Sequence, residues 1–167
     1  MLRCLIVILV LVAPVRAAAQ QTSEGPRVAA DFVAGMAAFI DEAPIGHTAA
    51  SATVRYQFTR RLSIGPEAVY MAGPGRDRDL FLTGNVIFDF LQRRAGLRAV
   101  SVNPYLVAGA GLMHHRGEFA DVSSFEGAWT AGAGARVWLN ERVYALGEYR
   151  LGWEPHARIT GDVGVMW

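Results

Sequence analysis

The last eleven residues of the chain, ARITGDVGVMW, alternate in character at every second position. One row holds Ala157, Ile159, Gly161, Val163, Val165 and Trp167, and the other holds Arg158, Thr160, Asp162, Gly164 and Met166. A period of two places successive side chains on opposite faces of a β-strand, whereas a helix would repeat every 3.6 residues. The segment therefore predicts a strand with one apolar face and one more polar face.

Seven further segments alternate in the same way, which gives eight expected strands, an even number as in bacterial outer-membrane barrels. Their apolar rows, taken at every second residue, run through 30–38, 50–58, 62–70, 80–90, 100–112, 129–139 and 143–153. Most of these segments have about the 9–11 residues of a tilted strand that crosses a membrane. Pro66 lacks the amide donor of an ordinary strand residue, so we expect a bulge there.

The first twenty residues stand apart from this pattern. Arg3 provides a positive start, Leu5 to Val12 form an apolar run, and Ala17 to Ala19 supply small residues before a cleavage point. These features are typical of a secretory signal peptide. We therefore expect residues 1–19 to be a signal peptide and residues 20–167 to form one barrel domain.

The composition of the remaining chain narrows its class further. Removal of Arg3 and Arg16 leaves 14 arginines, with no lysine, against 15 acidic residues, a formal charge of −1 that gives no sign of a nucleic-acid partner. Cys4 is lost with the signal peptide, so a disulfide or a thiol nucleophile is not expected. The full chain is 52% hydrophobic, yet no long apolar run follows residue 20. A transmembrane barrel reconciles these facts because its apolar residues occupy alternate positions.

The outward aromatic residues fall at two levels. With the amino terminus in the periplasm, turns at Arg60–Arg61, Gln92–Ala99 and Asn140–Glu141 would be periplasmic. The outer connections would be Asp41–His47, Gly73–Arg78, His114–Gly127 and Glu154–His156. Phe32, Phe58, Phe90 and Trp167 then lie at periplasmic strand ends, and Tyr70, Trp129 and Trp153 at outer ends. Two such girdles are typical of a barrel with two membrane interfaces.

Two late segments, NPYLVAGAGL and WTAGAGARVWL, resemble the late strands of the small eight-stranded outer-membrane barrels of Gram-negative bacteria, the OmpA and OmpX type. The terminal Trp167 resembles the assembly signal of that family. Its members usually carry Gly five residues before the final aromatic, where this chain has Asp162, with Gly161 one position off. The resemblance implies an eight-stranded antiparallel up-and-down barrel, chaperoned through the periplasm and inserted by the outer-membrane assembly machinery. It implies no particular activity.

The inward rows carry charges of both signs. They include Asp31, Arg55, Glu67, Asp89, Arg136, Glu148, Arg150 and Asp162. Counting residues across the connections predicts two interior clusters, Asp31/Arg55/Glu67 and Glu148/Arg150/Asp162. An unpaired buried charge costs several kcal/mol, and an eight-stranded barrel has room only for its own side chains. We therefore expect a lumen plugged by paired charges, with a gated pore or a polar catalytic site as the alternative.

The sequence favours a protein that is not an enzyme. Some barrels of the resembling type deacylate lipid A with a His–Ser pair beside a carboxylate on a late strand. The comparable stretch here, LGEYRLGWEP, has Glu148 but no neighbouring His or Ser. In the long outer loop, Ser123 and Ser124 accompany His114 and His115 without a defined third member. No catalytic residue and no cofactor are therefore expected.

All four histidines map to the expected outer connections, where acidic residues also gather. This rim comprises His47, His114, His115 and His156, with Asp41, Glu42, Asp77, Asp79, Glu118, Asp121, Glu126 and Glu154. Such a rim could bind a divalent cation or respond to mild acid. No spacing matches a defined metal motif, so solvated loop residues are the simpler interpretation.

These observations predict a monomeric barrel in the outer membrane, surrounded by lipid and lipopolysaccharide, with an envelope-integrity or surface-contact role through residues 114–127. A lipid A hydrolase, a narrow porin-like channel and a soluble lipocalin-like barrel are the alternatives. The last would need the charged rows and the aromatic rows to exchange faces, so it ranks lowest.

Overall fold

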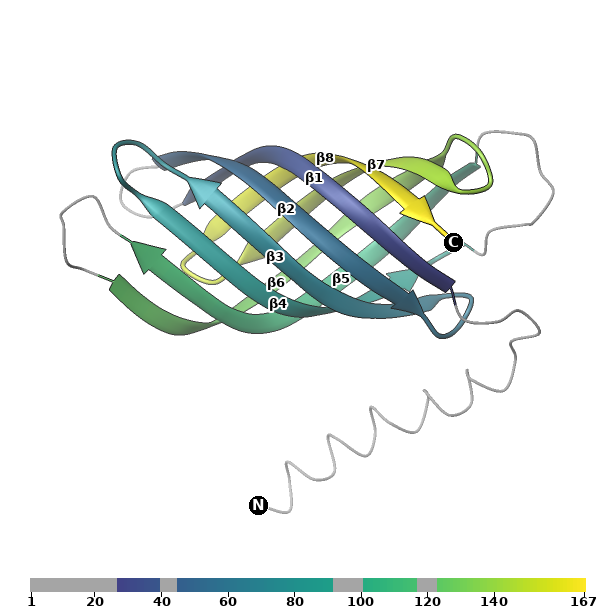
Figure 1. Cartoon of the computed structure of the whole chain (residues 1–167), viewed down its shortest axis with the longest axis horizontal. Coiled ribbons are helices and arrows are strands. Elements are labelled where there is room, and N and C mark those ends of the chain that lie inside the picture. Colours follow the sequence, from purple (N-terminus) through teal and green to yellow (C-terminus); the bar gives the residue numbers. More distant parts are fainter. Residues whose placement is uncertain (1–26, 40–44, 92–100, 117–122) are drawn as a thin grey trace, which may run out of the picture.

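The computed structural model describes residues 27–39, 45–91, 101–116 and 123–167. They form eight strands: β1 (Arg27–Phe39), β2 (Ile45–Gln57), β3 (Leu62–Ala72), β4 (Arg78–Asp89), β5 (Ser101–Arg116), β6 (Ser123–Trp138), β7 (Val143–Gly152) and β8 (His156–Met166). Each strand pairs antiparallel with the next in sequence, and β1 pairs with β8, so the sheet closes into a barrel (Figure 1). This confirms the expected fold class. The expected signal peptide and the 92–99 connection lie outside the described residues.

The closing seam uses the alternating segment at the end of the chain. Ala29 is registered with Met166, and Phe39 with His156. The amide of Trp167 donates to the carbonyl of Val28 at 2.9 Å, and the Val28 amide donates back at 3.1 Å. β1 therefore begins and β8 ends at the same end of the barrel (Figure 1). We call the opposite end the distal mouth; the β3–β4 and β7–β8 turns lie there, and β1 and β5 end there.

Side-chain exposure follows the expected alternation with apolar residues on the outside. Phe32 is 71% exposed, Leu112 57% and Ile159 67%, whereas Arg55 and Arg158 are each 2% exposed. In water this distribution would be unfavourable, but it suits a barrel whose outer face meets lipid. Among the described residues, no helix is long and apolar enough to cross a membrane.

Two local features differ from the expectation. Pro66 lies on the outer face of β3, and the register is the same on both sides of it, from Thr53 with Glu67 to Tyr56 with Ile64. No residue is inserted, so the expected bulge is absent from this strand pair. Within the expected outer loop 114–127, residues 114–116 and 123–127 are strand, because β5 continues to Arg116 and β6 begins at Ser123; residues 117–122 lie outside the described residues.

The interior is layered along the barrel axis. Near the termini an apolar and aromatic layer contains Ala29, Trp138, Tyr144 and Met166. Polar and charged side chains fill the middle. Toward the distal mouth a second apolar layer contains Ala37, Ala49, Val69, Met71, Phe81, Met113 and Ala128. Asp77 in the β3–β4 turn and His115, two residues after Met113 on β5, lie on the mouth side of that layer.

Candidate functional site

The charged lumen begins next to the layer at the termini. Arg55 donates from Nε to Asp31 Oδ2 at 2.6 Å, and both residues contact the hydroxyl of Tyr144. Arg136 is paired with Asp89, and its guanidinium carbon lies 4.0 Å from the centroid of the Tyr105 ring. These two buried arginines thus each have a carboxylate and an aromatic partner, which offsets the cost of burying their charge.

Glu67 is the centre of the second group of charges. Its carboxylate accepts from Arg150 Nη1 at 2.7 Å and from Arg158 Nη2 at 2.9 Å. Asn85 Nδ2 donates to it at 2.7 Å and Ser51 Oγ at 3.2 Å. Since Glu67 is only 3% exposed, these four donors replace the water that its carboxylate would otherwise bind.

Glu148, on β7, belongs to the same group of charges through its contact with Arg150. It accepts from Arg150 Nε at 2.5 Å and from the Tyr105 hydroxyl at 2.8 Å. Arg150 therefore bridges Glu67 and Glu148, which lie on β3 and β7. Strands that are not neighbours in the sheet are connected across the lumen by these contacts.

The two clusters counted from the sequence are rearranged by this crossing. Asp31 and Arg55 come together, and so do Glu148 and Arg150, but Glu67 lies with Arg150 instead of Arg55. In the described part of the chain, no ion pair joins Asp162 to Arg150. Register between adjacent strands does not predict these contacts, because long side chains in a narrow barrel reach opposite strands.

Several lumen residues were not singled out from the sequence. Arg158, Tyr105 and Tyr144 all occupy inward positions of their strands. The two-residue alternation of inward and outward positions therefore predicts that they face the lumen. Met71, Phe81 and Met113, each at most 1% exposed, also lie on inward rows, and they belong to the apolar layer toward the distal mouth.

The distal mouth brings together two of the four predicted histidines and two acids. His47 Nε2 lies 2.9 Å from Asp77 Oδ2 and 3.6 Å from Asp79 Oδ2. His115 Nδ1 lies 2.6 Å from Asp79 Oδ1 and 3.9 Å from Asp77 Oδ1. We call His47, Asp77, Asp79 and His115 the mouth cluster. The ligand atoms of its first three members lie within 4.8 Å of one another, close enough to share one metal ion.

Tyr70, which the sequence predicts to belong to the outer aromatic girdle, is registered with Leu80, and Asp79 is one residue closer to the distal mouth. Burial raises the pKa of the Asp79 carboxyl, and the nearby charge of Asp77 adds to the rise, although His115 opposes it. Burial alone would lower the pKa of His115, but its hydrogen bond to Asp79 and the Asp79 charge outweigh burial and raise it.

The other two predicted histidines lie elsewhere. His114 is on the outer face of β5, where its ring stacks on Phe125 with centroids 4.3 Å apart. His156 is buried between the rings of Phe39 and Phe81, at centroid distances of 5.3 and 5.2 Å. Neighbouring residues of a strand face opposite sides, which separates His114 from His115.

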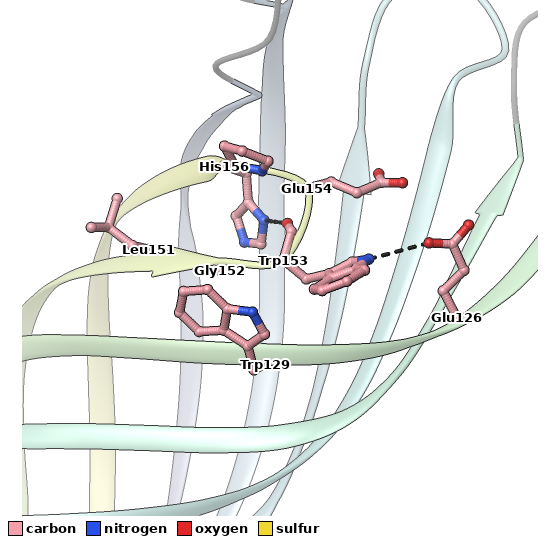
Figure 2. A pocket seen from close by; sticks show the side chains of 8 residues that line it. Glu126, Trp129, Leu151, Gly152, Trp153, Glu154 and His156 are labelled. Carbon is pink, nitrogen blue, oxygen red and sulfur yellow. Dashed lines mark hydrogen bonds between the residues drawn. The ribbon is translucent and has the colours of Figure 1, made fainter.

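A groove of about 470 Å³ lies beside the β7–β8 turn (Figure 2). Trp129 and Trp153 provide its aromatic walls, and the Trp153 indole nitrogen donates to Glu126 Oε2 at 3.2 Å. The carbonyl of Trp153 also accepts from His156 Nδ1 at 2.6 Å. Both tryptophans occupy the level expected for the outer aromatic girdle, so the groove suits the interface between lipid and water.

Solved structures share this architecture at low sequence identity. The N-terminal β-barrel domain of Pseudomonas aeruginosa OprF aligns with a TM-score of 0.65 and 14% identity, covering 84% of this chain and 97% of that one. Neisserial surface protein A aligns with a TM-score of 0.62 and 16% identity, covering 85% of this chain and 99% of that one. Ail of Yersinia pestis, in complex with the heparin analogue sucrose octasulfate, aligns with a TM-score of 0.55 and 15% identity, covering 86% of this chain and 99% of that one. Identities this low show the fold alone.

No curated protein sequence matches the chain. The family model for the outer membrane protein beta-barrel domain matches residues 5–163, nearly the whole sequence. Together with the closed eight-stranded sheet, its apolar outer face and its charged interior, this match shows that the chain belongs to the outer-membrane β-barrel protein family.

Proposed function

We propose that this protein is a monomeric outer-membrane barrel with a closed lumen, which acts without catalysing a reaction, through contacts made at its distal mouth. The proposal rests on the order of the side-chain layers along the lumen: an aromatic and apolar layer near the termini, charged side chains in the middle, and a second apolar layer toward the distal mouth. A pore needs a continuous polar path, and an eight-stranded barrel has little space beyond its own side chains.

Three layers support a closed lumen. Tyr144 and Trp138 fill the end near the termini, with ring centroids 4.6 Å apart. The group around Glu67 links β3 to β7 and β8 in the middle. Met71 and Phe81 belong to the apolar layer below the distal mouth. An ion would have to displace both apolar layers and break buried ion pairs.

The length of the distal strands supports a surface-contact role. β6 pairs with β7 only as far as Thr130 with Gly152, so residues 123–128 extend beyond the end of β7. Phe125 on this extension is 75% exposed. The similar barrel of Ail is described as an attachment invasion locus protein, and by analogy we assign contact with external partners to the β5–β6 hairpin.

Planar-bilayer recording of the refolded protein tests the closed lumen. We expect no steady conductance from the unaltered barrel. The variant F81A/M113A/R158A, which removes large side chains from the apolar layer and the charge network, should conduct and so show that the assay detects an opened lumen. Steady conductance of the unaltered protein would contradict the proposal and would favour the narrow channel.

A further inference from the structure

The mouth cluster is separate from the charge network of the lumen. Its four side chains come from β2, the β3–β4 turn, β4 and β5. Phe81 and Met113, which belong to the apolar layer, lie two residues farther from the mouth than Asp79 on β4 and His115 on β5. His47 and Asp79 are 2% and 1% exposed, so the cluster is partly sealed from water as well. None of these residues takes part in closing the lumen.

The ring of His47 is oriented for a cation. Its Nδ1 lies 3.1 Å from the backbone carbonyl of Ile45, which can only accept, so Nδ1 carries the proton of that hydrogen bond. In the neutral ring, Nε2 then presents a lone pair to Asp77 Oδ2 at 2.9 Å and to Asp79 Oδ2 at 3.6 Å. Lone pairs facing one another repel, so a positive species, either a proton or a metal ion, belongs between these atoms.

The carboxylates leave acceptor atoms free at the same place. Asp79 Oδ2 and Asp77 Oδ1 are buried without a hydrogen-bond partner. His115 Nδ1 holds the other oxygen of Asp79 at 2.6 Å, which fixes the orientation of that carboxylate. Metal ligands in proteins are commonly held in this way by a second group, and metal-binding histidines commonly donate their other nitrogen to a backbone carbonyl. One proton on His47 would serve Asp77 Oδ2 but would leave Asp79 Oδ2 unsatisfied.

The distances suit a tetrahedral ion. Bond lengths of roughly 2.0–2.2 Å place two ligands of tetrahedral zinc about 3.3 Å apart. The two separations of His47 Nε2 from the carboxylate oxygens, 2.9 and 3.6 Å, bracket that value. One imidazole with two carboxylates is a donor set that zinc accepts, whereas calcium prefers oxygen ligands only.

We propose that His47, Asp77 and Asp79 bind a divalent transition-metal ion, with zinc as the best fit, and that His115 positions Asp79 for it. Gly73 makes room for the site. A Cβ at this position would lie 2.4 Å from His47 Nε2 and 2.7 Å from Asp77 Oδ2, in the space where the ligand atoms converge. The ion would tie β2 to the β3–β4 turn and to β4 at the distal mouth.

Isothermal titration of the folded, EDTA-treated protein in detergent with zinc chloride tests this site. We expect one zinc ion per chain, and no comparable heat from calcium chloride. D79N removes one ligand charge with little change of shape, and G73A keeps every ligand but fills the site; both should abolish the binding. H115Q should weaken zinc binding about 10- to 100-fold.

The matched control is H114Q/E126Q, which removes one histidine and one acid from the same mouth but outside the mouth cluster, and it should bind zinc as the unaltered protein does. Gel mobility with and without boiling checks that each variant is folded. No binding by the unaltered protein, or equal affinity in folded D79N and G73A, would overturn the proposal. A closed lumen does not require the ion, so the conductance experiment is independent of this result.

Discussion

Replacement of Glu67 by glutamine is the sharpest test of the charge network in the lumen. The carboxylate accepts from Arg150, Arg158, Asn85 and Ser51 at distances between 2.7 and 3.2 Å. Glutamine has nearly the same shape, so the substitution removes charge and one acceptor without opening a cavity. The NH₂ group of the glutamine would point two N–H donors at the arginine, asparagine or serine groups that themselves donate to Glu67.

The expected loss of stability is large because the arginines remain buried. Arg158 is 2% exposed and Arg150 is 5% exposed, and neither can reach bulk water when Glu67 becomes neutral. Removal of one partner from a buried ion pair costs about 3–5 kcal/mol. Arg150 keeps Glu148 as a second carboxylate at 2.5 Å, which favours the lower part of this range.

Urea unfolding of the refolded barrel, followed by gel mobility, measures the effect through the midpoint and slope of the transition. Glu141, an exposed acid in the β6–β7 turn, provides the matched control: E141Q should change the free energy of unfolding by no more than about 0.5 kcal/mol. A double-mutant cycle of E67Q with R158Q should give a coupling energy of about 0.5–3 kcal/mol. If E67Q is as stable as E141Q, the buried network does not stabilise the barrel in the way described.

Two further pairs of substitutions, each a test with its control, examine the outer face and the sheet. Val86 faces outward midway along β4, so V86R should lower the free energy of unfolding in a lipid bilayer by about 2–4 kcal/mol. L139R, in the β6–β7 turn near the interface, should lower it by only about 0–1 kcal/mol. Equal losses in the two variants would argue against lipid at Val86. An added Cβ at Gly65 would lie 1.8 Å from the Val54 carbonyl oxygen, so G65A should lower the free energy of unfolding by about 1–3 kcal/mol. At Gly84 the nearest atom to an added Cβ is 4.0 Å away, so G84A should be neutral or slightly stabilising. A destabilised G84A with an unchanged G65A would contradict this packing.

The sequence was sufficient for the strands because their signal is local. A two-residue period sets which face each side chain occupies, so the outward position of Phe32 and the inward position of Arg55 follow from counting alone. The family match and the closed sheet confirm the expected barrel class.

Partners across the lumen could not be counted in this way. Glu67 on β3 meets Arg158 on β8, two strands that are not neighbours in the sheet, because strand tilt and barrel closure bring them to the same level. Counting between adjacent strands instead placed Glu67 with Arg55.

The mouth cluster shows the same limit. Histidines and acids were expected together at the rim, but which of them meet depends on where each strand ends. β5 continues through His114 and His115, so the two rings face opposite sides and only His115 reaches Asp79. The β3–β4 turn then brings Asp77 to His47.

The central claim is that the apolar face of this barrel meets lipid and its charged face fills the lumen. Refolding residues 20–167 into lipid vesicles, followed by gel electrophoresis with and without boiling, tests that claim most directly. We predict a compact band that resists the detergent and shifts to the mobility of the unfolded chain only on boiling. Folding in plain buffer without lipid, with no shift on boiling, would contradict the assignment of the two faces.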